Sequence, residues 1–197
     1  MSCMSRRARR QSASRMRKSK PLAMVLIGAG LVILGFTGLL LFTRSDSTAA
    51  EERSAIPLRV DFPAPELALH DLQGKAVSLT DYRGQVVLVN NWAIWCPPCK
   101  AEMPTLQAYF EDYRQQGFTI VAIESGDPAR QVAEFAESYN LTFDIWLDPT
   151  QQALLAFRNP GLPSSYVVDR EGKVRLAWTG AISRKMLEQY VTPLLEE

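Results

Sequence analysis

Apolar and polar positions divide the chain into four parts. Residues 1–20 are polar and basic, with no periodic apolar positions, and predict a disordered tail. Leu22–Phe42 is a run of 21 residues without a charge, long enough as a helix, at about 1.5 Å per residue, to span a hydrocarbon layer of about 30 Å. The pattern predicts a basic tail (1–20), a transmembrane anchor (21–43), a polar linker (44–56) and a folded domain (57–197).

Strands and helices are expected to alternate in the folded domain. Glu66–Leu79 alternates on two arms around Gln73-Gly74, which predicts a hairpin. Val86–Asn91 and Phe118–Glu124 are continuous apolar runs, typical of buried strands. Further strands are expected at 164–168 and 173–178, and helices at about 97–116 (kinked at Pro104), 128–139, 151–157 and after Ser183. This order predicts an α/β fold with a mixed sheet and helices on both faces.

Charge is distributed unevenly along the chain. Residues 1–44 carry nine basic and no acidic residues, whereas residues 45–197 carry 13 basic and 21 acidic ones. Eight of the nine basic residues precede the apolar run. The positive-inside rule therefore predicts a single-pass protein of the cell membrane, with its N-terminus in the cytoplasm and residues 45–197 outside. The net charge of −8 on that part argues against nucleic acid as a partner, because phosphate binding needs a concentrated basic face.

A cleaved signal peptide is the alternative to an uncleaved signal anchor. Ser47-Thr48-Ala49 is a weak small-residue cleavage candidate. A secretory apolar core usually runs for about 7 to 15 residues, and this one is longer. The length therefore favours the anchor, which would contact the lipid bilayer through Leu22–Phe42.

Cys96 and Cys99 lie where an apolar strand meets a helix. A pair of cysteines with this spacing can form a small, easily exchanged disulfide, with its first sulfur at the helix N-terminus. A metal site is the alternative, but two ligands do not complete a zinc site, and His70 is the only histidine. Cys3, the third cysteine, lies in the basic tail and is expected to be an ordinary reduced thiol. The pair therefore predicts redox chemistry with neither a metal nor a cofactor.

Three segments resemble a known family. VVLVNNWAIWCPPCKAEMP, with Trp92, the cysteine pair and Pro104, resembles the thioredoxin superfamily. FPAPELALHDLQGKAVSLTDYRGQ is similar to the N-terminal extension of its membrane-anchored TlpA/ResA-type thiol:disulfide oxidoreductases, a redoxin (AhpC-TSA-like) branch, and GLPSSY (161–166) is similar to the cis-proline loop. The resemblance covers about residues 57–197. It implies a thioredoxin-like mixed central sheet flanked by helices, with an N-terminal β-hairpin extension.

Single positions separate this branch from its neighbours. Thioredoxin itself has a buried aspartate six residues before the first cysteine, where this chain has Asn90. ResA-like proteins are similar in having asparagine there and a glutamate after the cysteine pair, which corresponds to Glu102. Peroxiredoxins would need proline and threonine at Val89 and Ala93. The sequence therefore resembles the ResA-like branch.

Cys96 is expected to be the nucleophile, because a helix N-terminus favours the thiolate. Cys99, one turn further, is expected to be shielded and to resolve the mixed disulfide. Pro97 and Pro98 lack an N–H, so the nearest backbone donors are Cys99 and Lys100. Fewer donors stabilise a thiolate less, and a strongly oxidising pair depends on a stabilised reduced form, so the two prolines predict a reductant.

Two carboxyl groups are candidates for proton transfer. Glu102 lies three residues after Cys99 on the same helix face, where it can take or return the Cys99 proton. The alternative is a first-turn glutamate that only favours the helix dipole. Glu124, at the end of a central strand, is a weaker candidate, and a solvated strand end is the favoured interpretation.

The substrate is expected to meet the domain around the cysteines. The resemblance implies a cis bond before Pro163, which would stack against the cysteine pair and leave the Leu162 backbone free to pair with a substrate segment. Trp95, Pro97 and Pro98 would border the same site. We expect Trp146, Trp178 and the set Tyr109, Phe110 and Tyr113 in the core, and His70 on the surface.

Together these features predict an extracytoplasmic, membrane-tethered reductase of disulfides in exported proteins. The resemblance implies apocytochrome c as a frequent substrate, with a membrane thiol reductant as electron donor. Two alternatives stay open: an oxidant that installs disulfides, and a client-binding module with incidental thiols. The reduction potential of the cysteine pair distinguishes the oxidant from a reductase. The activity of a Cys96→Ser, Cys99→Ser protein distinguishes the client-binding module, which would stay active, from either enzyme.

Overall fold

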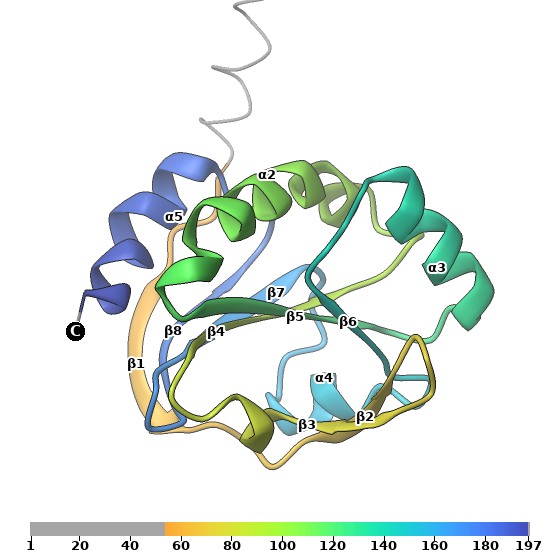
Figure 1. Cartoon of the computed structure of the whole chain (residues 1–197), viewed down its shortest axis with the longest axis horizontal. Coiled ribbons are helices and arrows are strands. Elements are labelled where there is room, and N and C mark those ends of the chain that lie inside the picture. Colours follow the sequence, from red (N-terminus) through yellow and green to blue (C-terminus); the bar gives the residue numbers. More distant parts are fainter. Residues whose placement is uncertain (1–53, 197) are drawn as a thin grey trace, which may run out of the picture. The chain divides into compact units, whose positions relative to one another are not determined.

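The computed structural model describes residues 54–196, shown in colour in Figure 1. The expected tail and transmembrane helix, Leu22–Phe42, lie outside the described residues. In the part that is described, no helix combines the length and the apolar character needed to cross a membrane.

One mixed sheet of eight strands forms the centre of the domain. Its order is β1-β8-β7-β4-β5-β6-β2-β3. The pairs β4–β5 and β5–β6 are parallel, and the other pairs are antiparallel. The strands are β1 (Leu58–Pro63), β2 (Ala68–Asp71), β3 (Ala76–Ser78), β4 (Val86–Trp92), β5 (Phe118–Glu124), β6 (Asp144–Leu147), β7 (Ser164–Val168) and β8 (Lys173–Thr179).

Helices cover both faces of this sheet. In Figure 1, α2 (Pro97–Tyr113), α3 (Ala129–Ser138) and α5 (Arg184–Tyr190) lie above it, and α4 (Gln152–Ala156) lies below. Short 3-10 helices complete the described elements: η1 (Leu79–Tyr82), η2 (Arg114–Gln116) and η3 (Thr192–Leu195). The core has one cluster on each side of the sheet, and the cluster under α2, α3 and α5 contains both cysteines.

The predicted α/β architecture is confirmed, although the sequence pattern did not predict two of the strands. β4 and β5 are buried at every position, which explains why their sequences are continuous apolar runs. β1 was not expected because it is an edge strand with mostly exposed residues, and it pairs with β8. β6 is four residues long, and it joins the predicted β2–β3 hairpin to β5. The helix predicted at 97–116 continues past Pro104 to Tyr113 and ends in η2.

Candidate active site

The cysteine pair lies at the junction of β4 and α2. β4 ends at Trp92, and a short turn leads to Cys96, the N-cap of α2, whose Sγ is bonded to that of Cys99. The backbone N–H of Cys99 donates to Cys96 Sγ at 3.3 Å. An N-cap side chain commonly accepts from the second or third helical N–H, and the second position here is Pro98. Cys99 therefore supplies the donor that Pro98 cannot.

Both sulfur-bearing residues are buried behind an exposed rim. Cys96 is 3% exposed and Cys99 is fully buried, as expected for a resolving thiol. Trp95 is 64% exposed, and Pro97 and Pro98 are exposed as well. A partner that approaches Cys96 would therefore meet the Trp95 ring and the two proline rings.

The proline loop before β7 lies beside the cysteine junction. The Leu162-Pro163 bond is cis, as the resemblance implied. β7 begins at Ser164, which pairs with Asn91 near the end of β4. Leu162 packs against the same core cluster that contains the cysteines, and within residues 54–196 its backbone N–H and C=O have no hydrogen-bond partner. These groups are therefore available to an extended segment of another protein.

Glu102 is a buried carboxyl group in α2, three residues after Cys99. It is 2% exposed, and burial raises its pKa to about 8, although two hydrogen bonds to its oxygens oppose the rise. Asn90 Nδ2 donates to Oε1 at 2.9 Å, and the Ile182 N–H donates to Oε2 at 3.1 Å. A glutamate that served only the helix dipole would be exposed in the first turn. The burial of Glu102 in the second turn favours proton exchange.

Tertiary structure adds two residues that sequence reasoning missed. Ser165 Oγ accepts the second Asn90 Nδ2 hydrogen at 3.0 Å, and Ile182 supplies its backbone N–H to Glu102. Ile182 lies 80 positions from Glu102 in the chain, and its contribution is a main-chain group. No local pattern could have indicated either contact, because both depend on the sheet bringing β4, β7 and the end of β8 together.

The interpretation of Glu124 as a solvated strand end is wrong. Its side chain is 0% exposed, and burial, followed by the hydrogen bond to the Asp127 side chain, raises its pKa to about 8. Oε2 accepts the Asp127 N–H at 2.9 Å, while the described chain offers no partner to Oε1. Asp127 Oδ2 in turn accepts the Ile94 N–H at 3.0 Å, in the turn before Cys96. The Asp148 N–H, just after β6, donates to the Glu124 carbonyl at 2.9 Å.

The predicted exposure of His70 and the predicted core positions of five aromatic residues are confirmed. His70 is exposed, and Trp146 and Trp178 are buried. Tyr109 and Phe110 are buried as well, and Tyr113 packs partly buried against the same cluster.

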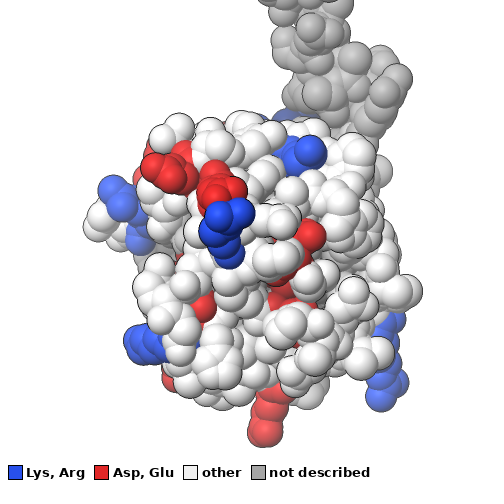
Figure 2. Space-filling view, turned by 90° about the vertical axis from the view of Figure 1, so that its right-hand side faces the viewer, with Lys and Arg blue, Asp and Glu red and all other residues white. Residues whose placement is uncertain are grey.

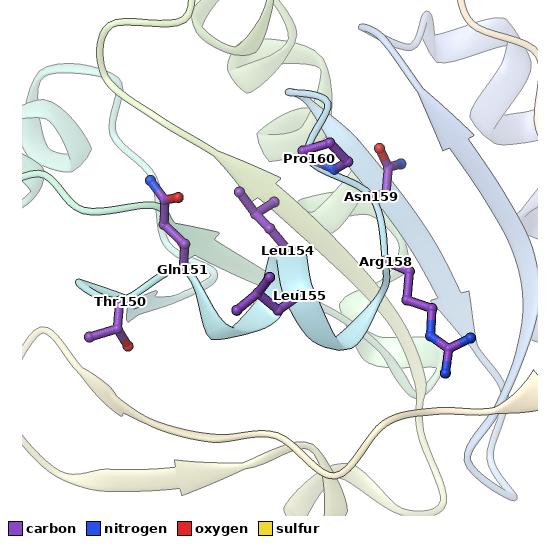
Figure 3. A pocket seen from close by; sticks show the side chains of 7 residues that line it. All are labelled: Thr150, Gln151, Leu154, Leu155, Arg158, Asn159 and Pro160. Carbon is purple, nitrogen blue, oxygen red and sulfur yellow. The ribbon is translucent and has the colours of Figure 1, made fainter.

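Away from the cysteines, a metal site, a pocket or a charged patch could also bind a ligand in the described domain. In residues 54–196, no three His, Cys, Asp or Glu side chains gather closely enough to hold a metal ion. A pocket of about 440 Å³ lies around α4, shown in Figure 3, and is lined by Thr150, Gln151, Leu154, Leu155, Arg158, Asn159 and Pro160. On the face shown in Figure 2, charges of both signs are scattered over a mostly uncharged surface.

Comparisons with known proteins agree with this geometry. The AhpC/TSA family matches residues 60–177. The thiol-disulfide oxidoreductase ResA of Geobacillus thermodenitrificans is 38% identical over 140 residues, which cover 71% of this chain and 79% of that protein. The ResA of Bacillus subtilis is 35% identical over 128 residues, which cover 65% of this chain and 72% of that protein.

Solved structures show the same fold. A thiol:disulfide interchange protein of the thioredoxin family from Chlorobium tepidum superposes with a TM-score of 0.63 at 26% identity, covering 69% of this chain and 97% of that one. The thioredoxin domain of a thiol-disulfide oxidoreductase from Bacteroides vulgatus gives the same TM-score and identity, covering 70% of this chain and 99% of that one. With its cysteine pair at the N-terminus of α2, this chain thus belongs to the AhpC/TSA family as a ResA/TlpA-type thiol:disulfide oxidoreductase.

Proposed function

We propose that this oxidoreductase is a membrane-tethered, extracytoplasmic reductase of disulfides in exported proteins. The observation that carries the direction of transfer is the N-cap of α2. Pro98 occupies the position that would otherwise give Cys96 Sγ a second backbone donor. A thiolate with fewer donors is less stabilised, so the disulfide form is favoured and the dithiol gives up its electrons more readily.

The proposed exchange proceeds in two steps. The Cys96 thiolate attacks one sulfur of the client disulfide, which forms a mixed disulfide and releases the other client sulfur as a thiolate. Cys99 gives its proton to Glu102 and attacks Cys96 Sγ, which re-forms the Cys96–Cys99 bond and releases the second client sulfur. The client gains two electrons, and its two thiolates take up one proton from Glu102 and one from solvent, which had received the Cys96 proton. A membrane thiol reductant then restores the dithiol with two electrons and two protons.

Sequence features support the proposed location and clients. Leu22–Phe42 is uncharged and has eight basic residues before it, which favours a cytoplasmic N-terminus and an exterior catalytic domain. Clients would be exported proteins with disulfides, among them apocytochrome c by resemblance to the family. The exposed Trp95 and the unpaired Leu162 backbone offer such a client an apolar contact and a strand edge.

The reduction potential of the cysteine pair tests the direction. A soluble fragment should begin at Ala50, ahead of Ser54 and Ala55, whose hydrogen bonds to residues 181 and 183 belong to the domain. Equilibration against thiol buffers should give a value near thioredoxin's, about −270 mV. A value near −120 mV would identify an oxidant instead.

Trapping and topology experiments test the clients and the location. In the full chain, Cys99→Ala should accumulate mixed disulfides with exported proteins, while Cys96→Ala should accumulate none. A C-terminal reporter that is active only outside the cytoplasm should be active. Mixed disulfides with cytoplasmic proteins alone, or an inactive reporter, would refute the location.

A further inference from the structure

Two residues at the start of the described chain are bonded to the loop between β8 and α5. The Ala55 N–H donates to the Ala181 carbonyl at 2.8 Å. The Ser183 N–H donates to Ser54 Oγ, also at 2.8 Å. The residue between these two anchor points, Ile182, donates its own N–H to Glu102 Oε2 at 3.1 Å. The loop residue that contacts the buried carboxyl is therefore held on both sides by the same short segment.

The other contacts of this loop point into the active site. The Gly180 N–H donates to the carbonyl of Pro163, in the cis-proline loop, at 2.8 Å. Ile182 is buried in the core cluster that contains both cysteines, and Ala55 packs against that cluster. The loop thus connects the Ser54–Ala55 segment, the cis-proline loop and Glu102.

We propose that Ser54 and Ala55 form a strap that positions the Ile182 N–H on Glu102 and so sets how readily this carboxyl exchanges a proton with Cys99. Ser54 and Ala55 are positioning residues, because neither contacts a sulfur. The inference rests on the proton role of Glu102 in the proposed function. It extends the active site to a part of the chain that no cysteine motif includes.

The physical reason lies in the few partners of the Glu102 carboxyl. Only Asn90 and Ile182 donate to it within the described structure, and both bonds stabilise its charged form. Without the Ser54 hydroxyl, residues 181–183 would lose one of their two hydrogen bonds to the Ser54–Ala55 segment. The hydrogen bond from the Ile182 N–H to Glu102 Oε2 would then be formed for a smaller fraction of the time. The Glu102 pKa would then rise further, and the carboxylate that accepts the Cys99 proton would form only at higher pH.

The experiment compares Ser54→Ala, Ser54→Thr and a control, Ser78→Ala, in the full chain in detergent micelles. Ser78 is a matched control because its hydroxyl also accepts a backbone N–H, that of Thr80, in η1. The Glu102 pKa is measured by ¹³C NMR of labelled glutamate carboxyls, with Glu102→Gln to assign the signal. The pH dependence of mixed-disulfide resolution is measured in parallel.

In Ser54→Ala we expect the Glu102 pKa and the midpoint of the resolution profile to rise by about half to one unit. Ser54→Thr should restore both values, because it keeps the hydroxyl, and Ser78→Ala should leave both unchanged. The Ile182 amide should exchange with deuterium faster in Ser54→Ala only.

Three outcomes would overturn the inference. The first is an unchanged Glu102 pKa in Ser54→Ala, even with faster Ile182 exchange or a lower melting temperature, since the segment would then only add stability. The second is an equal shift in Ser78→Ala, which would indicate general loosening. The third is the absence of rescue by threonine. A resolution rate that Glu102→Gln leaves unaltered would instead refute the proton role in the proposed function, whatever the Ser54 variants do.

Discussion

At the scale of single residues, two buried carboxyl groups accompany the cysteine pair. Glu102 and Glu124 lose their hydration, and burial raises the pKa of each to about 8. They differ in their partners. Both oxygens of Glu102 accept hydrogen bonds from elements outside α2, whereas Glu124 Oε1 has no partner among residues 54–196. Glu102 is therefore held in one orientation near the resolving cysteine's helix turn, which suits proton exchange.

The first prediction concerns Glu102 directly. In Glu102→Gln, glutamine keeps the shape of the Glu102 side chain and its place beside Asn90, but it cannot accept a proton. The attack of Cys99 on the mixed disulfide should therefore slow by roughly 100-fold, which is the lower end of the rate enhancement that general base catalysis gives. Stopped-flow measurement of mixed-disulfide decay gives the rate. Glu111→Gln, an exposed change on the same helix, is the control and should leave the rate unaltered.

The second prediction concerns Asn90, where thioredoxin has an aspartate. Asn90→Asp would place a second carboxyl group about where Nδ2 now donates to Glu102. Two buried like charges repel, so the variant should be destabilised by a few kcal/mol at pH 8 and much less at pH 5, where the pair holds protons. Urea unfolding at both pH values measures this difference. Asn140→Asp, on the surface, should show no such pH dependence, and equal losses at both pH values in Asn90→Asp would contradict the argument.

At the scale of elements, the start of α2 determines the redox properties. Its N-cap is Cys96, and its first two positions are prolines, which fit a helix start because their missing N–H groups would have no partner within the helix. The same prolines remove one of the two donors that an N-cap can use. One local motif therefore both starts the helix and limits the stabilisation of the thiolate.

The third prediction tests that motif. Pro98→Ala adds a backbone N–H at the second helical position, so the Cys96 thiolate gains a donor and the pair becomes more oxidising. A hydrogen bond to a charged group is worth about 1.5 to 3 kcal/mol, which corresponds to roughly 30 to 60 mV. Equilibration with thiol buffers measures the potential, and Pro193→Ala in η3 serves as the control. An unchanged or lower potential in Pro98→Ala would show that the donor count does not set the direction.

At the scale of the whole molecule, the sheet brings the separate parts of the site together. β4 carries the cysteine turn, its antiparallel neighbour β7 carries the cis-proline loop, and the loop after β8 carries Ile182. Residues from both halves of the domain therefore converge at one end of the sheet. Glu102 is hydrogen-bonded where these parts meet, and Glu124 is buried at the end of β5. The burial of both carboxyl groups has a consequence for stability.

The fourth prediction is that the oxidised domain loses stability as the pH rises. Each buried carboxyl has a folded-state pKa of about 8, above its ordinary value of 4.5. The folded state therefore binds protons that the unfolded state releases. Its extra stability is fully present below about pH 4.5 and is lost as the pH rises through 8. One pKa unit corresponds to about 1.4 kcal/mol, so a rise from 4.5 to about 8 corresponds to roughly 5 kcal/mol for each group.

Urea unfolding of the fragment from Ala50 at pH 5, 7 and 8.5 measures this loss. The double variant Glu102→Gln, Glu124→Gln should have a much flatter profile, because glutamine does not titrate. A free energy of unfolding that rises between pH 5 and 8.5 in the unmodified domain would contradict the assignment of both groups as buried acids.

Features that depend on neighbouring residues could be predicted from the sequence. Continuous apolar runs gave β4 and β5, because strands buried on both faces need apolar side chains at nearly every position. The spacing of Cys96 and Cys99 gave a redox pair at a helix start, because one helical turn brings the two sulfurs within bonding reach.

Features that depend on contacts between distant segments could not be predicted, because those contacts exist only in the folded chain. Glu124 is acidic and ends a strand, so its local sequence predicts exposure, yet its side chain is fully buried in the folded domain. Two hydrogen bonds are examples: the Ile182 N–H donates to Glu102, and the Ser183 N–H donates to the Ser54 hydroxyl. No sequence pattern marks any of these groups as a partner of the other. Main-chain donors occur at nearly every position, and only the folded chain selects which of them reaches a buried carboxyl.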